Sequence, residues 1–388
     1  MKGIVKRMFT FVMVLMIAVT GMPQTAGAKT VKKHFYVSPL LDLGINTGNY
    51  NWERGLQDLN GELYDSLIKA GNHFEGKQAS YYIIRYKKNG KVAKEKLPIK
   101  QKNSVLTMTA SRWDQGAESY RLAIGCDGNY HISCGILLPS EYDDPIWNDC
   151  VYYIVSKKGK VVKKFTLNRD SALKEKIKEA CVAAGMDMGE RPEVSVRGGC
   201  GYQKDHLLLS CEVTRFSSET EWAEGKRPVT YCIIADYDYK TDKINWVRSV
   251  DSGSEEYYLN SASTIVKSDD SYNIVDKRFP NKIRIADIKT GEEKLNMDSY
   301  NKKGWYDISY YDGTVYGVKD AGIYKYNIKT EKWKKVCSLS SSDLKKLHAS
   351  EKLPISLRII NEKSFLLYGH EWLFEYHKKK VKVLRIDL

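Results

Sequence analysis

The sequence predicts an all-β protein, a β-propeller of about six four-stranded blades, with seven blades as the alternative. Three observations support this fold. In Trp305–Cys337, three tight turns separate four short segments rich in Tyr, Val, Ile and Trp. A hairpin pattern recurs along the chain. Two of its turns, at Thr290 and Thr330, lie 40 residues apart, a spacing typical of propeller blades.

The segment Trp305–Cys337 is the clearest single blade. Its turns are Tyr311–Gly313, Asp320–Gly322 and Lys329–Glu331, and the first two contain Asp and Gly, which tolerate positive φ. Four strands of this length form one up-and-down sheet, which is too small to bury a core by itself. The segment therefore requires further copies in the chain.

The second half of this unit is a hairpin in which an apolar or aromatic strand and a short turn are followed by a lysine-rich strand. Six copies occur, and each predicts the third and fourth strands of a blade. They are Tyr81–Leu97, Val151–Leu167, Cys232–Val247, Lys282–Leu295, Gly322–Val336 and Glu371–Ile386.

Two further strands precede most of these hairpins. The first unit is degenerate, with His34–Leu40 as its expected first strand and no evident second strand. The chain thus begins on a first strand and ends on a fourth, so the ring is expected to close between whole blades. A further strand-like run, Ser104–Ala110, keeps the count of seven open. The predicted pairs are Ser119–Gly125 with Tyr130–Leu137, Glu193–Gly198 with His206–Val213, Ala262–Lys267 with Ser271–Asp276, and Ile355–Ile360 with Ser364–Tyr368.

Long loops, and one or two short helices, are expected on one face of the ring. The hairpin turns are short, whereas the long segments follow second strands or join blades, and these connections share a face. Leu173, Ile177 and Cys181 lie on one side of a helix predicted over Ser171–Gly185, and Ser340–His348 is a shorter candidate. The long segments are Gly44–Ser80, Pro98–Glu118, Pro139–Asn148, Asn168–Pro192 and Thr214–Pro228.

Two turn sequences, Lys289-Thr290-Gly291 and Lys329-Thr330-Glu331, each flanked by strands, resemble blade cores of secreted bacterial β-propeller repeat proteins. The resemblance is to the kelch, PQQ-repeat and TolB-like kinds, and it holds at the level of single blades. It implies the fold and no activity. The residues with which PQQ-repeat enzymes hold their cofactor are not found in this sequence, so no cofactor is expected.

Residues 1–28 predict a signal peptide. A basic start is followed by the apolar run Met8–Val19, and Ala26–Ala28 has the small residues of a cleavage site. The apolar run is shorter than the roughly 20 residues of a membrane-spanning helix. We therefore expect a secreted, extracellular protein in which residues 29–388 form a single propeller domain without a membrane span.

The chain is basic, with a net charge of +14 that falls to +11 without residues 1–28, which contain three basic residues and no acidic ones. Lysines in turns and on alternate strand positions protect sheet edges from pairing with other chains. They also attract anionic wall polymers or acidic glycans. Nucleic acid is not an expected partner, because an exported chain with no nucleic-acid-binding module has no reason to meet it.

The cysteines recur in matching positions of the second and third units. Because the strands that carry them are neighbours and export permits disulfides, Cys134–Cys150 and Cys211–Cys232 are predicted pairs. Buried thiols that act as small apolar residues fit equally well. No metal site is expected, since no CxxC motif or histidine cluster accompanies them.

Enzyme signatures are missing from the sequence: it contains no HExxH, GxSxG, P-loop or GxGxxG motif. Asp236, Asp238 and Asp242 hint at a calcium loop, but the glycine and the glutamate of such a loop are absent. We interpret these aspartates as part of a solvated hairpin.

An aromatic and acidic group on the long-loop face is the candidate binding site. It predicts a non-enzymatic exported protein that binds a glycan, a cell-wall polymer or a protein. The alternative is a carbohydrate-active enzyme, a glycoside hydrolase or lyase, that uses paired loop carboxylates. A further interpretation is that these tryptophans only pack the long loops against the ends of the sheets and bind no ligand. The candidate residues are Trp52, Trp113, Asp114, Glu118, Trp147 and Trp222.

Overall fold

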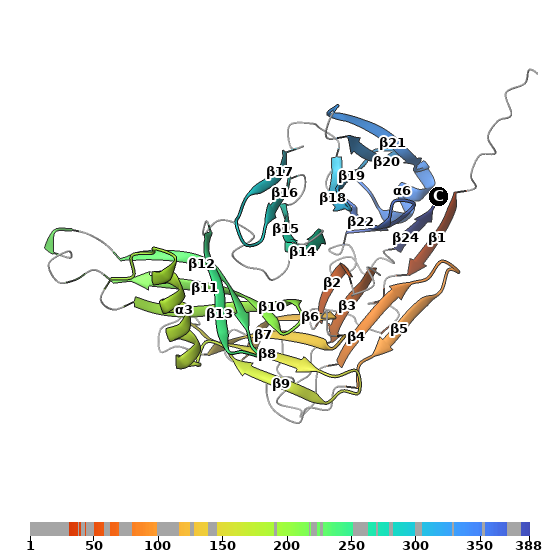
Figure 1. Ribbon diagram of the computed structural model, residues 1–388. Coiled ribbons are helices and arrows are strands. Elements are labelled where there is room, and N and C mark those ends of the chain that lie inside the picture. The colour runs from red at the N-terminus through yellow and green to blue at the C-terminus, as the bar shows by residue number, and fades with distance from the viewer. Residues whose placement is uncertain are drawn as a thin grey trace, which may run out of the picture.

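Six four-stranded antiparallel sheets, arranged as blades around a ring, make up the fold in the computed structural model (Figure 1). The protein is therefore a six-bladed β-propeller, and the described helices are two short ones. The described residues are 31–37, 39, 43, 50–57, 63–69, 80–98, 116–124, 128–138, 146–189, 192–216, 218, 223–225, 228–250, 263–268, 271–278, 282–298, 305–327, 330–350, 354–370 and 382–388.

Each blade is a meander whose first strand lies toward the ring centre and whose fourth strand lies at the circumference (Figure 1). Blade 1 consists of β2 (Tyr50–Gln57), β3 (Leu63–Lys69), β4 (Ser80–Tyr86) and β5 (Val92–Lys96). Blade 2 consists of β6 (Gly116–Ile124), β7 (Tyr130–Leu138), β8 (Ile146–Val155) and β9 (Val161–Thr166). Blade 3 consists of β10 (Pro192–Gln203), β11 (His206–Arg215), β12 (Val229–Asp238) and β13 (Lys243–Val250).

The other three blades are built in the same way. Blade 4 consists of β14 (Ser263–Ser268), β15 (Ser271–Arg278), β16 (Lys282–Asp287) and β17 (Glu293–Asp298). Blade 5 consists of β18 (Trp305–Tyr311), β19 (Thr314–Lys319), β20 (Gly322–Asn327) and β21 (Lys332–Ser338). Blade 6 consists of β22 (Ser356–Asn361), β23 (Ser364–Tyr368), β24 (Lys382–Asp387) and, as its outermost strand, β1 (Lys32–Val37).

Blade 6 corrects the expected closure of the ring. β24 pairs with β23 on one side and with β1 on the other, in a register that sets Lys32 opposite Asp387 and Val37 opposite Lys382. The predicted first strand of the first unit, His34–Leu40, is therefore mostly the fourth strand of the last blade. The prediction of closure between whole blades is wrong, because the two ends of the chain complete one sheet together.

Blade 1 contains a second correction. The segment Gly44–Ser80 was expected to be a long loop, but it holds β2 and β3, the two strands that the sequence did not reveal. Five of the six predicted third-and-fourth-strand hairpins are confirmed, in blades 1 to 5; the sixth, Glu371–Ile386, is wrong because β24 is the third strand of its blade and β1 is the fourth. The run Ser104–Ala110, on which a seventh blade depended, lies outside the described residues.

The tight turns have the backbone conformations that their residues favour. In blade 5, Asp312, Gly313, Asp320 and Glu331 all have positive φ, between 38° and 70°. In blade 4, Gly291 has a φ of 74°. These left-handed positions confirm the turns predicted from Asp, Gly and the Lys-Thr-Gly/Glu pattern.

The two helices α3 (Ser171–Ala183) and α6 (Ser341–Leu347) follow the outermost strand of one blade and precede the innermost strand of the next. α3 begins where Asp170 caps Leu173 N–H, and its buried side contains Leu173, Ile177 and Cys181, as predicted. α6 has a reciprocal capping box between Ser340 and Asp343. In the part of the chain that the structure describes, no helix is long and apolar enough to cross a lipid bilayer.

Hydrogen bonds from one blade to the next supplement the apolar packing between their faces. Tyr64 Oη accepts a hydrogen bond from Ile124 N–H at 2.8 Å, and Tyr152 Oη accepts one from Gly201 N–H at 2.7 Å. Further contacts at other junctions join Arg248 Nε to Ile288 O, Leu357 N–H to Asp307 Oδ2, and Tyr368 Oη to Asp65 Oδ1. Buried polar groups need such partners, so these bonds fix how neighbouring blades sit.

Candidate functional site

Trp52 was predicted to lie in an exposed loop, and the structure corrects this. It belongs to β2, is 7% exposed and packs in the core between blades 1 and 6. Its indole Nε1–H donates to Asp65 Oδ2 at 3.2 Å, and its ring meets Tyr368 edge-on at 6.2 Å. Trp52 is therefore a packing residue of the ring closure and is removed from the candidate binding site.

The carboxylate of Asp65 is the centre of that closure. It is fully buried and accepts hydrogen bonds from Trp52 Nε1, Gly55 N–H, Tyr86 Oη and Tyr368 Oη. Burial raises the pKa of Asp65, while the four donors act in the opposite direction. Because all four donors belong to blades 1 and 6, the group holds the first and last blades together and is not open to a substrate.

The other candidate residues are less fully described. Glu118 lies in β6 and Trp147 in β8, where the backbone of Trp147 pairs with Leu137. Both were expected in loops, and both are in strands that extend further than predicted. Trp113, Asp114 and Trp222 lie outside the described residues. The predicted rim of aromatic and acidic side chains is therefore still a prediction at these five positions.

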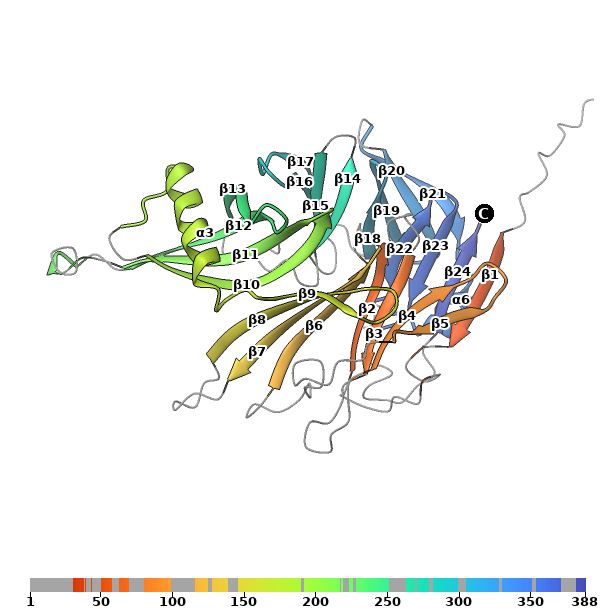
Figure 2. The ribbon, with the colours of Figure 1, turned by 60° about the horizontal axis from the view of Figure 1, so that its bottom comes forward.

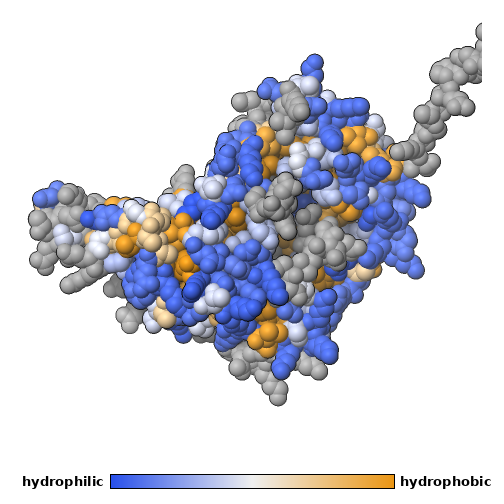
Figure 3. Space-filling view, viewed as in Figure 1, coloured by the Kyte–Doolittle hydropathy of each residue, from blue (hydrophilic) through white to orange (hydrophobic). Residues whose placement is uncertain are grey.

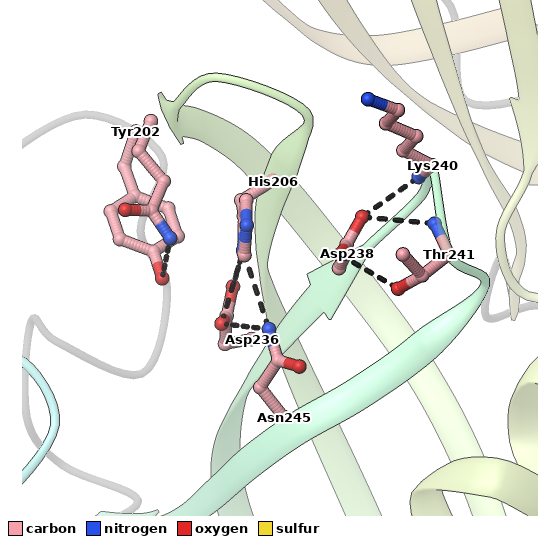
Figure 4. A network of polar contacts seen from close by, with 8 residues as sticks. Tyr202, His206, Asp236, Asp238, Lys240, Thr241 and Asn245 are labelled. Carbon is pink, nitrogen blue, oxygen red and sulfur yellow. Dashed lines mark hydrogen bonds and ion pairs between the residues drawn. The ribbon is translucent and has the colours of Figure 1, made fainter.

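A polar network lies between blades 3 and 4 (Figure 4), and the sequence predicted it only as a solvated hairpin containing Asp236. Asp236 on β12 is 2% exposed, and both its oxygens contact His206 Nδ1, at 2.9 and 3.1 Å. Asn245 Nδ2, from β13, donates to Asp236 Oδ2 at 2.8 Å. Burial raises the pKa of Tyr202 far above its usual range, and the nearby Asp236 carboxylate adds to this. The ring of Tyr202 meets Tyr272 of blade 4 edge-on at 5.2 Å.

This arrangement orients the imidazole of His206. Its Nδ1 is held by the carboxylate, so Nε2 is the ring nitrogen available for a proton or a ligand. The side chain is 19% exposed. A histidine–carboxylate pair resembles the base of a hydrolytic site, but no nucleophile completes it among the described residues. Its evident role is to satisfy a buried carboxylate at a junction between blades.

The three aspartates of the hinted calcium loop have separate partners in the structure. Asp236 turns inward to His206, whereas Asp238 accepts hydrogen bonds from Lys240 N–H and from the backbone and hydroxyl of Thr241 (Figure 4). Asp242 accepts from Tyr237 Oη at 2.9 Å and lies 2.5 Å from Lys176 Nζ of α3. They therefore do not converge on one point.

The register of the sheets tests one predicted disulfide. Cys211 is paired with Ile233, and Glu212 with Cys232. Paired residues share a face and successive residues alternate, so Cys211 and Cys232 lie on opposite faces of blade 3. The prediction of a Cys211–Cys232 bond is therefore wrong. In blade 2, the backbone of Cys134 pairs with Val151 and that of Gly135 with Cys150, and the Cys134–Cys150 bond stays a prediction.

Blade 3 has long strands, as neighbouring blade 2 does, where β6, β7 and β8 have 9, 9 and 10 residues. β10, β11 and β12 have 12, 10 and 10 residues, whereas β18, β19 and β20 of blade 5 have 7, 6 and 6. The extra length carries the β11–β12 hairpin well beyond the other blades (Figures 1 and 2). At the end of the hairpin, Phe216 is 46% exposed and Val229 is 43% exposed.

α3 covers the apolar side of this extension (Figure 2). Ile177 and Cys181 are buried with Val194, Val213 and Ile233 of blade 3. In the middle of the helix Lys176 contacts Asp242. In the connection that follows, Asp187 Oδ2 lies 3.1 Å from Arg215 Nε. The hairpin is thus an arm supported by α3, and its apolar side belongs to the core that also packs blade 2 against blade 3. The long connections predicted at Asn168–Pro192 and Thr214–Pro228 meet beside it.

Comparisons with known proteins add little about function. No protein-family model matches the sequence, and no curated protein matches it. The solved structures to which it is similar include a luciferin-regenerating enzyme, at 8% identity over 92% of this chain and 96% of that chain, with a TM-score of 0.39. Another is the dihydro-heme d1 dehydrogenase NirN in complex with DHE, at 10% identity over 86% of this chain and 66% of that chain, with a TM-score of 0.37. Neither likeness bears on the activity or the residues of this chain, and the kelch, PQQ-repeat or TolB-like affiliation of its blades stays a prediction.

Proposed function

We propose that the chain is an exported, non-enzymatic propeller that binds a polymer or a protein partner through the arm of blade 3 and the long connections beside it. The observation that supports this most directly is the lengthening of β10–β12, which raises one hairpin above the ring and buttresses it with α3. An extension of this kind is not needed to close a blade, since blade 5 does so with strands of six or seven residues. Rigid scaffolds that carry long connections commonly use them for binding.

Three deeply buried carboxylates of the described residues serve the fold and do not form a catalytic pair. Asp65, Asp236 and Asp307 are each no more than 2% exposed, and each accepts hydrogen bonds from groups of the fold itself. A glycosidase needs two carboxyl groups that face each other across a substrate, roughly 5–9.5 Å apart. These three carboxylates are instead used to join strands and blades.

The end of the arm supplies apolar contact area. Phe216 and Val229 are exposed there, and Trp222 belongs to the segment that connects β11 to β12. Aromatic side chains at such positions bury a large area on a partner and dominate many binding energies. Trp113 and Trp147 are the other aromatic residues proposed for this site, with Asp114 and Glu118 as polar neighbours.

The proposal is tested with the mature chain, residues 29–388, and a panel of insoluble polysaccharides and wall preparations. Co-sedimentation measures binding, and assays for new reducing ends measure cleavage. We expect binding without cleavage, weakened at least tenfold in Phe216→Ser and Trp222→Ala, the scale of a lost anchor residue. Val37→Ser is the matched control, because Val37 is 42% exposed on β1 of blade 6 and belongs neither to the arm nor to its connections.

Two results would overturn the proposal. Release of reducing ends by the purified chain would favour the carbohydrate-active enzyme instead. Equal binding by wild type and both arm variants would show that the arm is not the site. N-terminal sequencing of the exported protein tests the separate expectation of cleavage after Ala28.

A further inference from the structure

Basic charge is concentrated on the outermost strands of five of the six blades; in blade 4, β17 has one lysine against two acidic residues. The six outermost strands contain twelve Lys or Arg residues against three acidic ones, Glu95, Glu293 and Asp298. The six innermost strands contain five basic and four acidic residues. The basic residues of the outermost strands are Lys32, Lys33, Lys94, Lys96, Lys163, Lys164, Lys243, Arg248, Lys294, Lys332, Lys334 and Lys335.

Most of these side chains point into solvent at the circumference. Nine of the twelve are exposed, and the other three, Lys33, Lys163 and Arg248, are half-buried with partners in the fold. Neither Lys332 nor Lys334 forms an ion pair with another described residue. Hydrophilic side chains dominate the outer margin of the ring beside β1 and β5 (Figure 3).

The charges form a repeated pattern. Lys332 and Lys334 are two positions apart on β21 and therefore lie on the same face, about 7 Å from each other. Lys94 and Lys96 repeat this spacing on β5. Blades 5, 6 and 1 follow one another around the ring, so their outermost strands form an arc of cations that α6 extends with Lys345 and Lys346.

Protection of sheet edges does not account for the whole pattern. Charged side chains discourage an edge strand from pairing with another chain, and this does not require an excess of one sign around the ring. β21 has three lysines and no acidic residue in seven positions. An excess of one sign repeated over five of the six blades creates a long-range positive potential, which attracts and concentrates anions along most of the circumference.

We infer that the circumference of the ring binds a linear polyanion, a polymer whose repeating charges are phosphate or carboxylate groups. Lysines supply point charges that tolerate many geometries, whereas arginine would impose planar, two-pronged recognition. Eleven of the twelve cations are lysines, so the surface should recognise charge density and not a specific sugar. This surface is separate from the arm of blade 3, so the inference goes beyond the proposed function.

The test uses fluorescence anisotropy to measure how tightly the mature chain, residues 29–388, binds three soluble polymers of equal length. Long-chain polyphosphate probes phosphate groups, polygalacturonate probes carboxylates and dextran is the neutral control. We expect one or both anionic polymers to bind, and dextran not to bind. Raising the salt from 50 to 300 mM should weaken the binding at least tenfold, because counterions compete with exposed charges.

Charge-matched variants locate the site. K332Q/K334Q/K335Q removes three exposed lysines from an outermost strand and should weaken binding about tenfold, as expected for three exposed contacts of modest strength. The control K158Q/K204Q/K240Q removes three exposed lysines from turns of blades 2 and 3 and should change binding less than twofold. Melting temperatures check that both variants are folded.

Three outcomes would overturn the inference. If the two variants lose affinity equally, only the net charge matters. If no anionic polymer binds at 50 mM salt, the surface has no such ligand. If the outermost-strand variant binds normally but aggregates, its lysines serve edge protection alone. The arm variants Phe216→Ser and Trp222→Ala should bind the polyanions like wild type, so failure here leaves the proposed function untouched.

Discussion

Tyr368 Oη donates a 2.8 Å hydrogen bond to Asp65 Oδ1, although 303 positions separate the two residues in the chain. The bond joins the last blade to the first, and Trp52 and Tyr86 donate to the same buried carboxylate. A single acceptor thus serves donors from both sides of the junction that closes the ring. Removing it should affect the whole fold and not one blade.

Asp65→Ala is expected to lower the free energy of unfolding by about 3–5 kcal/mol, since several buried donors lose their acceptor at once. Tyr368→Phe removes one donor and should cost about 1–2 kcal/mol. Urea titration followed by far-UV circular dichroism measures both. Tyr324→Phe is the control, because the Tyr324 hydroxyl makes no hydrogen bond to another described residue, and it should change stability by less than about 0.5 kcal/mol. If Tyr368→Phe changes the free energy of unfolding no more than Tyr324→Phe does, the hydrogen bond from Tyr368 to Asp65 does not help to close the ring.

Two glycines of β10 form a matched pair. A Cβ at Gly201 would lie 2.8 Å from His131 Nδ1 and 3.3 Å from Tyr152 Oη, whereas a Cβ at Gly198 would have no atom within 4 Å. Gly201→Ala should therefore destabilise the protein by about 1–3 kcal/mol through overpacking at the junction of blades 2 and 3. Gly198→Ala should be neutral within about 0.5 kcal/mol. Thermal unfolding of the two variants checks this. Equal melting temperatures would show that His131 and Tyr152 can shift to accommodate the added methyl group at little cost.

Acid should weaken the attachment of the outermost strand of blade 6. Burial opposes ionisation of Asp343, but the ammonium of Lys33 and the cap at Ser340 outweigh it, so the pKa of Asp343 is lowered below 3.8. A carboxyl with a depressed pKa stabilises the fold above the unfolded value and loses this contribution as pH falls through the folded value. The unfolding free energy of wild type should therefore drop more steeply between pH 5 and 3 than that of Asp343→Asn.

The control for this pH profile is Glu292→Gln, in an exposed turn of blade 4. Its profile should follow wild type. Parallel profiles for wild type and Asp343→Asn would mean that the Lys33–Asp343 contact contributes nothing to the acid sensitivity. At pH 7 the Asp343→Asn variant should also lose about 1 kcal/mol, because the helix cap and the ion pair are weakened together.

Trp52 and Trp222 should behave in opposite ways. Trp52→Ala empties a buried site in the core and should cost about 3–5 kcal/mol. Trp222→Ala should leave the melting temperature within about 1 °C of wild type, since we expect that side chain on the surface of the arm. Differential scanning fluorimetry of the two variants decides this. If Trp222→Ala melts as early as Trp52→Ala, Trp222 is a packing residue and the proposed binding site loses its central aromatic.

Most of the fold was predictable because its signals are local. The turns of blade 5 have Asp and Gly where positive φ is needed, and both helices have recognisable starts at Asp170 and Ser340. In these places the chemistry of two or three adjacent residues determines the conformation. Five hairpins could be located from the sequence for the same reason.

Blade 1 was hidden because its strands lack the usual alternation. β3 has six consecutive buried positions, and one of them is Asp65. A buried run that includes an aspartate follows neither the period of a half-exposed strand nor the composition of a buried one. Its partner β2 contains Gly55 at a bulge, where the register with β3 shifts. The environment that makes Asp65 acceptable comes from Tyr368, which no local pattern can reveal.

The candidate site was harder to predict than the fold. Trp52 was assigned to the site because its segment was expected to be an exposed loop. The segment is a strand, so the side chain is buried. The His206–Asp236 pair was missed because its residues are 30 positions apart and meet only when β11 and β12 are in register. A signal was nevertheless present: His206 opens one predicted strand and Asp236 lies in the next, and an antiparallel pairing that aligns the two strand ends makes them diagonal neighbours.

The sheet shared by β1 and β24 sets an order of events for the newly made chain. Blades 1 to 5 are each continuous in sequence, so the strands of each can pair as soon as they have been synthesised and pack when the next blade follows. β1 is made first and must wait for β24, more than 340 residues later, while its unpaired edges remain open to wrong partners. The same arrangement places residues 31 and 388 side by side at one edge of blade 6. A circular permutant that joins these two residues and places the new chain ends at an exposed turn would make blade 6 continuous in sequence. In that permutant β1 would be synthesised directly after its partner β24.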